Sequence, residues 1–151
     1  MREIKFYWIL ILFLTFSCET NNDCEDIACF TDPAALRFEL VDKTTNENLF
    51  TNETYSPTQI RIVDLEDNES VDFTFIDYDN RNIISIHSIG WQTETINYSI
   101  RIENEEIFTL YVDAERLNEN CCSFTRYNVI SIENSEFEID TINSTYKIFV
   151  E

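Results

Sequence analysis

The residues best suited to chemistry lie in one short acidic stretch, Asp77-Tyr78-Asp79-Asn80-Arg81-Asn82. Carboxylate and amide oxygens are hard ligands of the kind that Ca²⁺ prefers. Asp77 and Asp79 place two such oxygens on one side of a turn, and Asn80 and Asn82 add two more. The stretch departs from an EF-hand loop, since Arg81 takes the third ligand place and no glycine follows. It predicts either a calcium site or a solvated turn between strands.

Catalytic residues are harder to assemble. His87 is the only histidine, and the pattern from Asn82 to Ile89 places it on a strand with Ser85 nearby. A nucleophilic serine needs a base and a sharp turn of the GxSxG type, which Gly90, the only glycine, cannot build alone. Acidic residues are so numerous that no pair of them marks a glycosidase. The sequence therefore predicts a protein without enzymatic activity, with a hydrolase around His87 as the less favoured alternative.

Four cysteines indicate cross-linking: Cys24, Cys29, Cys121 and Cys122. In an exported chain, four cysteines imply two disulfides with three possible connectivities. Adjacent strand residues point to opposite faces, so Cys121 and Cys122 are expected to pair separately with Cys24 and Cys29. There are two alternatives. One is a Cys24–Cys29 bridge with a vicinal Cys121–Cys122 bridge, and the other is a zinc site of four thiolates.

The first eighteen residues read as an export signal. Arg2 and Lys5 precede an apolar run from Phe6 to Leu14, which is shorter than the roughly 20 residues that span a bilayer. Leu14-Thr15-Phe16-Ser17-Cys18 resembles a bacterial lipobox, with Thr15 where the family favours leucine. The resemblance implies that Cys18 is lipidated and anchors the mature protein to a membrane. An ordinary signal peptide is the alternative.

Charge limits the partners. The net charge is -19, so nucleic acid and anionic membrane surfaces are excluded as partners, whereas divalent cations and basic proteins are permitted. Residues 19–33 are polar and acidic, and we interpret them as a tether. Acidic residues just after Cys18 resemble the signals that send lipoproteins of Bacteroidota to the outer face of the outer membrane, which favours exposure at the cell surface. The resemblance implies an outer-membrane anchor that faces either the cell surface or the periplasm.

Two weaker signals lie on surfaces. Trp91 follows Gly90, and Tyr111 and Tyr127 fall out of phase with the apolar sides of their strands. All three are candidates for binding a glycan or a protein, or for covering a second sheet face. Asp140-Thr141-Ile142 resembles the Asp-Thr-apolar sequence that Bacteroidota O-glycosylate on exported proteins. The resemblance implies a glycan at Thr141.

The elements that position these residues have a period of two from Ala34 onward. Apolar and polar residues alternate over several short runs, and only Asp113 to Asn118 reads as weakly helical. The runs are 36–40, 59–65, 71–75, 82–89, 96–102, 108–112, 123–132, 137–139 and 146–150. This pattern predicts an all-β fold, an antiparallel immunoglobulin-like β-sandwich of about eight strands, with a small β-barrel as runner-up. Asparagine and aspartate are expected to supply the turns, because glycine is scarce.

The whole chain resembles the small lipoproteins of flavobacteria and their relatives in its signal, cysteine, acidic tether, all-β region and late Cys-Cys pair. The resemblance implies a location and a fold, and no activity. Three segments are expected: a signal over 1–18, a tether over 19–33 and a sandwich over 34–151. The sequence thus predicts a lipid-anchored, non-catalytic binding or structural module. A calcium-dependent carbohydrate-binding accessory protein and, less favoured, a hydrolase are the alternatives.

Overall fold

The computed structural model describes residues 29–119 and 121–151. This part of the chain contains ten strands and two short 3-10 turns, and no α-helix. The strands are β1 (Cys29–Phe30), β2 (Leu36–Asp42), β3 (Ile60–Asp64), β4 (Thr74–Ile76), β5 (Ile83–Ile86), β6 (Glu94–Ile102), β7 (Glu105–Glu119), β8 (Cys122–Glu133), β9 (Glu136–Asp140) and β10 (Thr145–Val150), and the turns are η2 (Pro57–Gln59) and η3 (Tyr78–Asn80). The all-β prediction is confirmed. The weak helix expected at Asp113 to Asn118 is wrong, because these residues pair with β8 inside β7.

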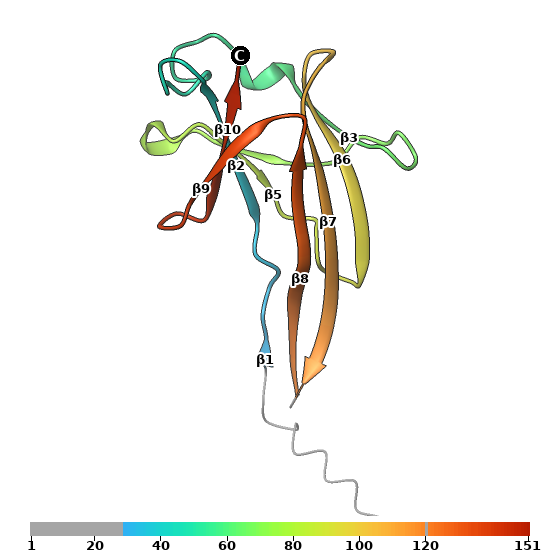
Figure 1. Cartoon of the computed structure of the whole chain (residues 1–151). Helices are drawn as coiled ribbons and strands as arrows, with labels where there is room; N and C mark the ends of the chain where they lie inside the picture. Colours follow the sequence, from blue (N-terminus) through green and yellow to red (C-terminus); the bar gives the residue numbers. More distant parts are fainter. Residues whose placement is uncertain (1–28, 120) are drawn as a thin grey trace, which may run out of the picture.

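The strands form two mixed sheets of five (Figure 1). One has the order β1-β8-β7-β6-β3 and the other β4-β5-β2-β10-β9. Most neighbours are antiparallel, but β1 runs parallel to β8 and β10 runs parallel to β2. The prediction that the strands are antiparallel is therefore wrong for these two pairs, and the described residues contain ten strands where about eight are predicted. Both exceptions arise because strands from the beginning of the chain lie beside strands from its end, and such distant pairing leaves no local signal in the sequence.

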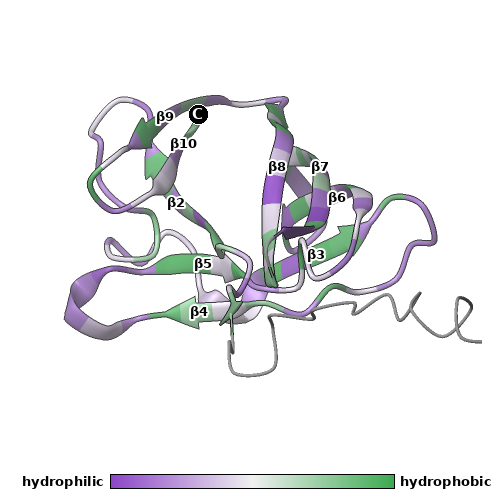
Figure 2. Cartoon of the chain, turned by 90° about the horizontal axis from the view of Figure 1, so that it is seen from below, coloured by the Kyte–Doolittle hydropathy of each residue, from purple (hydrophilic) through white to green (hydrophobic). Residues whose placement is uncertain are grey.

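The core lies between the two sheets. Phe38 from β2, Phe108 from β7 and Ile148 from β10 are fully buried. The Phe38 ring centroid lies 5.1 Å from that of Phe108 and 5.6 Å from that of Tyr146, so aromatic contacts join both sheets. Figure 2 shows the sheets facing each other around this interior, with apolar and polar residues alternating along the strands. Burial of one face of each strand is the main stabilising contribution.

The β7–β8 hairpin is the longest feature of the molecule. β7 has 15 residues and β8 has 12, so β7 alone extends on the order of 45 Å. The register shifts between Asp113 and Ala114, so that Tyr127 lies opposite the fully buried Ala114. Such a bulge shifts the period of two by one residue. Tyr127 therefore faces the core, and the prediction that it is out of phase is wrong.

A disulfide fastens β1 to the end of this hairpin. Cys29 and Cys122 are register partners, with sulfur atoms 2.00 Å apart. The Thr31 amide donates to the Ser123 carbonyl at 2.9 Å, and Arg116 donates to the Thr31 carbonyl at 2.9 Å. The predicted separate pairing is confirmed for Cys29 with Cys122, which rules out the Cys24–Cys29 bridge, the vicinal bridge and the four-thiolate zinc site.

The remaining predictions for the N-terminal region fall outside the described residues. Cys121, which lies within the described residues, is also disulfide-bonded. Cys24, the lipidation site Cys18 and the signal over 1–18 lie in the part that the structure does not describe. Pairing with β8 begins at Cys29, within the 19–33 segment expected to be a tether. No helix in residues 29–119 and 121–151 has the length and apolar character needed to cross a membrane.

Most turns use asparagine or aspartate where the backbone takes a positive φ, as expected from the single glycine. Asn68 has a φ of 63°, Asp79 54° and Asn134 68°. Three hairpins depart from this rule, since Glu103 (56°), Cys121 (70°) and Ser144 (52°) take the positive φ, as does Glu53 (62°) in a loop. Tight hairpins need this geometry whatever residue is available.

Candidate functional site

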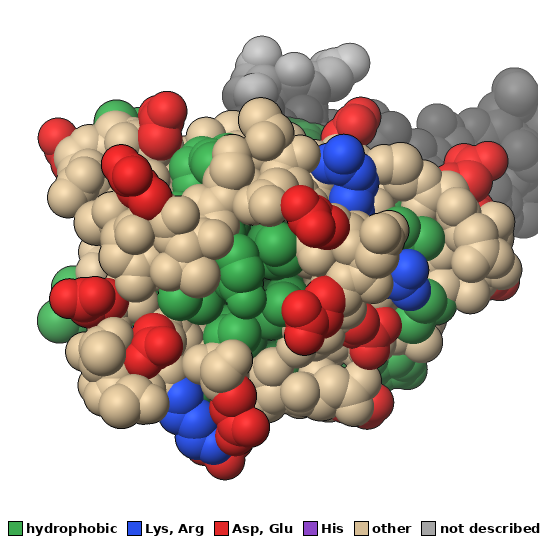
Figure 3. All heavy atoms as spheres, turned by 90° about the horizontal axis from the view of Figure 1, so that it is seen from above, with side chains coloured by type: hydrophobic (Ala, Val, Ile, Leu, Met, Phe, Trp, Pro, Cys, Tyr) green, Lys and Arg blue, Asp and Glu red, His purple; other side chains and the backbone are tan. Residues whose placement is uncertain are grey.

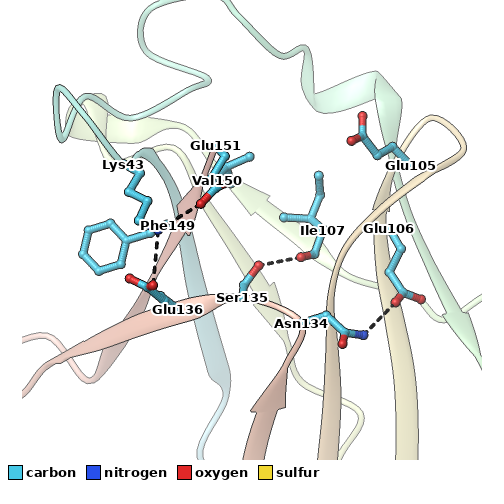
Figure 4. Close-up of a pocket in the computed structure, with 10 residues that line it drawn as sticks. All are labelled: Lys43, Glu105, Glu106, Ile107, Asn134, Ser135, Glu136, Phe149, Val150 and Glu151. Atoms are coloured by element: carbon cyan, nitrogen blue, oxygen red, sulfur yellow. Dashed lines mark hydrogen bonds and ion pairs between the residues drawn. The ribbon is translucent and has the colours of Figure 1, made fainter.

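A pocket of about 510 Å³ lies at the end of the molecule away from the hairpin tip. The start of β7, the corner between β8 and β9 and the end of β10 surround it (Figure 4). Its lining residues are Lys43, Glu105, Glu106, Ile107, Asn134, Ser135, Glu136, Phe149, Val150 and Glu151. Figure 3 shows apolar side chains in the centre of this face with acidic side chains around them. The lining is thus mainly polar, with four carboxylates and Lys43 beside the apolar Ile107, Phe149 and Val150.

One wall is organised by Lys43. Its Nζ lies 3.0 Å from Glu151 Oε1 and 3.2 Å from Glu136 Oε1. Its backbone amide donates to the Val150 carbonyl at 2.9 Å, which holds the residue beside β10. The hydrogen bonds to the two carboxylates, and their negative charge, raise the pKa of Lys43. The lysine therefore stays charged, and this wall carries two negative charges for one positive charge.

The opposite wall is organised by Glu106. Ser99 Oγ donates to its Oε2 at 2.5 Å, while Asn134 Nδ2 and Thr109 Oγ1 donate to its Oε1 at 3.1 and 3.3 Å. Arg101, the register partner of Glu106, donates from Nε to Ser99 Oγ at 2.9 Å. The hydrogen bond from Ser99 has the largest effect and lowers the pKa of Glu106. Burial has the next largest effect and raises it, while the hydrogen bonds from Asn134 and Thr109 and the charge of Arg101 lower it further. Glu106 is therefore ionised at neutral pH.

The corner between the sheets closes the pocket. Asn134 has a φ of 68°, which turns the chain from β8 into β9. Ser135 Oγ donates to the Ile107 carbonyl at 2.6 Å and so joins this corner to the start of β7. Figure 4 shows Asn134 and Ser135 reaching across to β7 from the corner. Hydrogen bonds thus set the shape of the pocket.

The lining of the pocket is mainly acidic. Four carboxylates, from Glu105, Glu106, Glu136 and Glu151, face one cation from Lys43. A ligand with positive charge and an apolar portion complements this lining. Among the ten lining residues there is no histidine or cysteine, and the hydroxyl of Ser135 is committed to a backbone carbonyl.

The predicted calcium ligands lie elsewhere, in η3 and the turn after it. Asp79, Asn80 and Asn82 all have positive φ, between 49° and 61°. Asn82 Nδ2 donates to Thr51 Oγ1 at 2.7 Å, so its side chain holds a neighbouring loop. In the described part of the chain no three His, Cys, Asp or Glu side chains gather where they could hold a metal ion. A site at Asp77, Asp79, Asn80 and Asn82 stays a prediction.

His87 does have a serine within hydrogen-bonding distance. Ser85 Oγ lies 3.0 Å from His87 Nε2, just past the end of β5. Ser85 is fully buried, however, whereas His87 is exposed. A substrate at the surface has no access to the serine oxygen, so this pair is best explained as a hydrogen bond that satisfies a buried hydroxyl.

The three aromatic candidates are not brought together into one site. Trp91 is 49% exposed and stacks on Phe30, with ring centroids 6.0 Å apart. Tyr127 donates to the carbonyls of Ala34 at 2.8 Å and Ile89 at 3.2 Å, which gives it a role in holding the N-terminal segment. Tyr111 lies on the outer face of β7, one position from the fully buried Leu110 and Val112. Only Trp91 is an exposed ring.

Thr141 lies in the turn between β9 and β10 and is exposed. Its neighbour Ile142 is 91% exposed, so the turn stands clear of the domain surface. This position is compatible with the predicted glycan, which stays a prediction.

Sequence reasoning missed the pocket entirely. Its residues come from four separate stretches, around Lys43, Glu106, Ser135 and Val150, and acidic residues are too common in this chain for any one to stand out. The positions share one property, since all lie at or next to the ends of strands. Comparison with protein-family models, with curated proteins and with solved structures finds no match for this chain.

Proposed function

We propose that this protein is a lipid-anchored, non-catalytic binding module of the bacterial outer membrane. The order of cations, apolar run and Cys18 at the N-terminus supports the anchor. The acidic lining of the pocket supports binding of a cationic ligand. A lipidated Cys18 would carry more than one acyl chain, which gives stable attachment where one chain does not.

The Cys29–Cys122 disulfide carries this proposal. It fastens the chain to the tip of the β7–β8 hairpin only eleven residues after Cys18. The pocket begins at Glu105, at the other end of β7 and on the order of 45 Å away. A lipid on Cys18 would therefore place the hairpin tip next to the membrane and direct the pocket away from it, toward ligands in solution or on other proteins (Figure 1).

We further propose that the two sheets form an immunoglobulin-like sandwich. The separation of the sheets supports it, since in the described residues β3 is not paired with β4, nor β8 with β9. A closed barrel would need such pairings at both seams.

The acidic rim supports a ligand that combines a cationic group with an apolar portion. The choice between the cell surface and the periplasmic face rests on the acidic residues after Cys18, which resemble surface-export signals.

The anchor is tested with Cys18→Ala, and Thr20→Ala in the same tether is the matched control. We expect mass spectrometry of the wild-type N-terminus to find an acylated Cys18, and we expect Cys18→Ala to leave the membrane fraction while Thr20→Ala stays. Protease added to intact cells distinguishes the two faces of the membrane. A wild-type N-terminus that begins at a residue other than Cys18 contradicts the anchor.

The binding role is tested separately at the pocket. We expect the double charge reversal Glu105→Lys with Glu151→Lys to abolish capture of cationic ligands from native membranes and medium. Glu66→Lys, an exposed acidic residue in another loop, is the control and should leave capture unchanged. Equal capture by all three proteins contradicts the pocket as a binding site and leaves the anchor untouched.

A further inference from the structure

β9 is an open sheet edge with room for another strand. It pairs with β10 along its whole length and is the last strand of its sheet. Among the described residues no strand pairs with its other side, so backbone donors and acceptors are left for a partner. All of Glu136, Phe137, Glu138 and Ile139 are exposed.

The two apolar residues of β9 make this edge unusual. Phe137 is 41% and Ile139 50% exposed. Their register partners on β10 are Ile148 and Tyr146, which belong to the core or pack against it. The Phe137 and Tyr146 ring centroids are 6.1 Å apart. Phe137 and Ile139 thus continue the inner face of the sheet beyond the area that the other sheet covers, where exposed apolar surface favours an incoming strand.

The other face of β9 is acidic. Glu136, Glu138 and Asp140 alternate with the apolar pair, as the period of two requires. Glu136 is ion-paired with Lys43 at 3.2 Å, and Lys147 is the register partner of Glu138. Asp140 accepts hydrogen bonds from Ile142 and Asn143 in its own turn. These residues still leave the row with a net negative charge. Two copies of β9 paired antiparallel about Glu138 would set Glu138 against Glu138 and Glu136 against Asp140. Like charges directly opposite each other are destabilising, so the edge disfavours a second copy of this chain.

We propose that β9 accepts an extended segment of a basic protein, which adds to the sheet as an eleventh strand. In this segment Lys or Arg alternates with Val, Ile or Phe. The apolar residues cover Phe137 and Ile139, the cations face Glu136, Glu138 and Asp140, and main-chain hydrogen bonds pair with the free edge. The proposal rests on the proposed binding role and names the partner class, and it requires no lipid anchor.

The probe is a synthetic peptide of about seven residues that alternates Val and Lys. A peptide of the same composition with its Val and Lys residues in separate blocks is the control. We expect the full-length protein to bind the alternating peptide in a fluorescence-anisotropy titration and to bind the block peptide at least about tenfold more weakly. We also expect hydrogen exchange of β9 amides to slow on binding, which attraction between charges alone does not produce.

Two charge reversals separate β9 from the rest of the acidic surface. Glu138→Lys should weaken binding of the alternating Val/Lys peptide at least about tenfold and create binding of an alternating Val/Glu peptide, whereas Glu66→Lys should do neither. Unchanged melting temperatures show that both variants fold. Four results would each overturn the proposal. The first two are that the alternating and block peptides bind equally well and that Glu138→Lys and Glu66→Lys change peptide binding equally. The other two are that the protein forms a dimer through β9 and that the peptide binds without slowing hydrogen exchange of the β9 amides. None of these experiments requires acylation of Cys18, and none uses the Glu105→Lys with Glu151→Lys variant that tests the pocket.

Discussion

Cys29 and Cys122 lie directly opposite each other in a parallel pair of strands, with Cα atoms 4.5 Å apart. This bond joins residues 93 positions apart and connects the N-terminal end of the domain to the tip of its longest hairpin. The orientation that we propose for the molecule at the membrane depends on it.

Removal of this bond should cost stability. In the chain-entropy treatment, a loop of this length contributes on the order of 4 to 5 kcal/mol. We expect the double variant Cys29→Ser with Cys122→Ser to unfold at a markedly lower urea concentration than the wild-type protein. The control is the double variant Thr93→Ser with Thr141→Ser, which introduces two serines at exposed positions and should unfold at the wild-type urea concentration. An unchanged midpoint in the cysteine variant would show that the bond is not needed for folding.

The second bridge should join Cys24 to Cys121. Cys121 is disulfide-bonded, Cys122 is already paired with Cys29, and Cys18 is proposed to carry lipid. We expect peptide mapping of the unreduced protein to recover a Cys24–Cys121 peptide. A Cys18–Cys121 peptide would instead refute lipidation of Cys18.

Gly90 should not tolerate a side chain. Its φ is +91°, and a Cβ placed there would lie 2.6 Å from Thr125 Cγ2 and 3.1 Å from the Tyr127 hydroxyl. Strain and overpacking each cost roughly 1 to 3 kcal/mol. We expect Gly90→Ala to lower the free energy of unfolding by about 2 kcal/mol or more, measured by urea denaturation. Gln92→Ala, in the same turn, should change it by less than about 0.5 kcal/mol.

Glu106 should contribute stability that depends on pH. Its pKa in the folded state lies below the ordinary 4.5, so the contribution is fully present above pH 4.5 and is lost as the pH falls through the folded pKa. We expect Glu106→Gln to be less stable than the wild-type protein at pH 7, with a difference that shrinks below pH 4.5. Glu105→Gln is the matched control. A difference that stays constant from pH 7 to pH 3 would contradict the hydrogen-bonded role of the carboxylate.

Ser85 should not react as a nucleophile. Its oxygen is 3.0 Å from His87 Nε2, but the residue has no exposed surface. We expect a fluorophosphonate probe to leave Ser85 unlabelled in the native protein, as judged by mass spectrometry of the intact chain. Labelling that is lost in His87→Ala would support the hydrolase alternative instead.

The strands could be predicted because their cause is local. A strand with one buried face must alternate apolar and polar residues, and this pattern located nine of the ten strands in the described residues, although β4 begins at Thr74 rather than at Val71. The two-residue strand β1 has no such pattern, since it is held by its disulfide and by pairing with β8. The alternating direction of strand side chains predicted that Cys121 and Cys122 pair separately with Cys24 and Cys29, and the structure decided that Cys122 is the partner of Cys29.

Errors in the prediction share one physical origin. The bulge beside Asp113 moved Tyr127 to the inner face, and pairing with β8 turned the expected helix at Asp113 to Asn118 into strand. Both effects come from a partner strand, and tertiary pairing overrides local preference. The parallel pairs β1 with β8 and β2 with β10 join the two ends of the chain, and no turn sequence announces them.

The amino-acid sequence by itself determined the β class, the placement of most strands and the separate pairing of Cys121 and Cys122, because alternation and side-chain direction act between near neighbours. It also carries the export and lipidation signals on which the proposed location rests. Only the tertiary structure decided which sheet edge stays open and which carboxylates meet around Lys43. Those arrangements depend on how distant strands pair, and the chain contains too many similar acidic residues for spacing alone to single out the four that line the pocket.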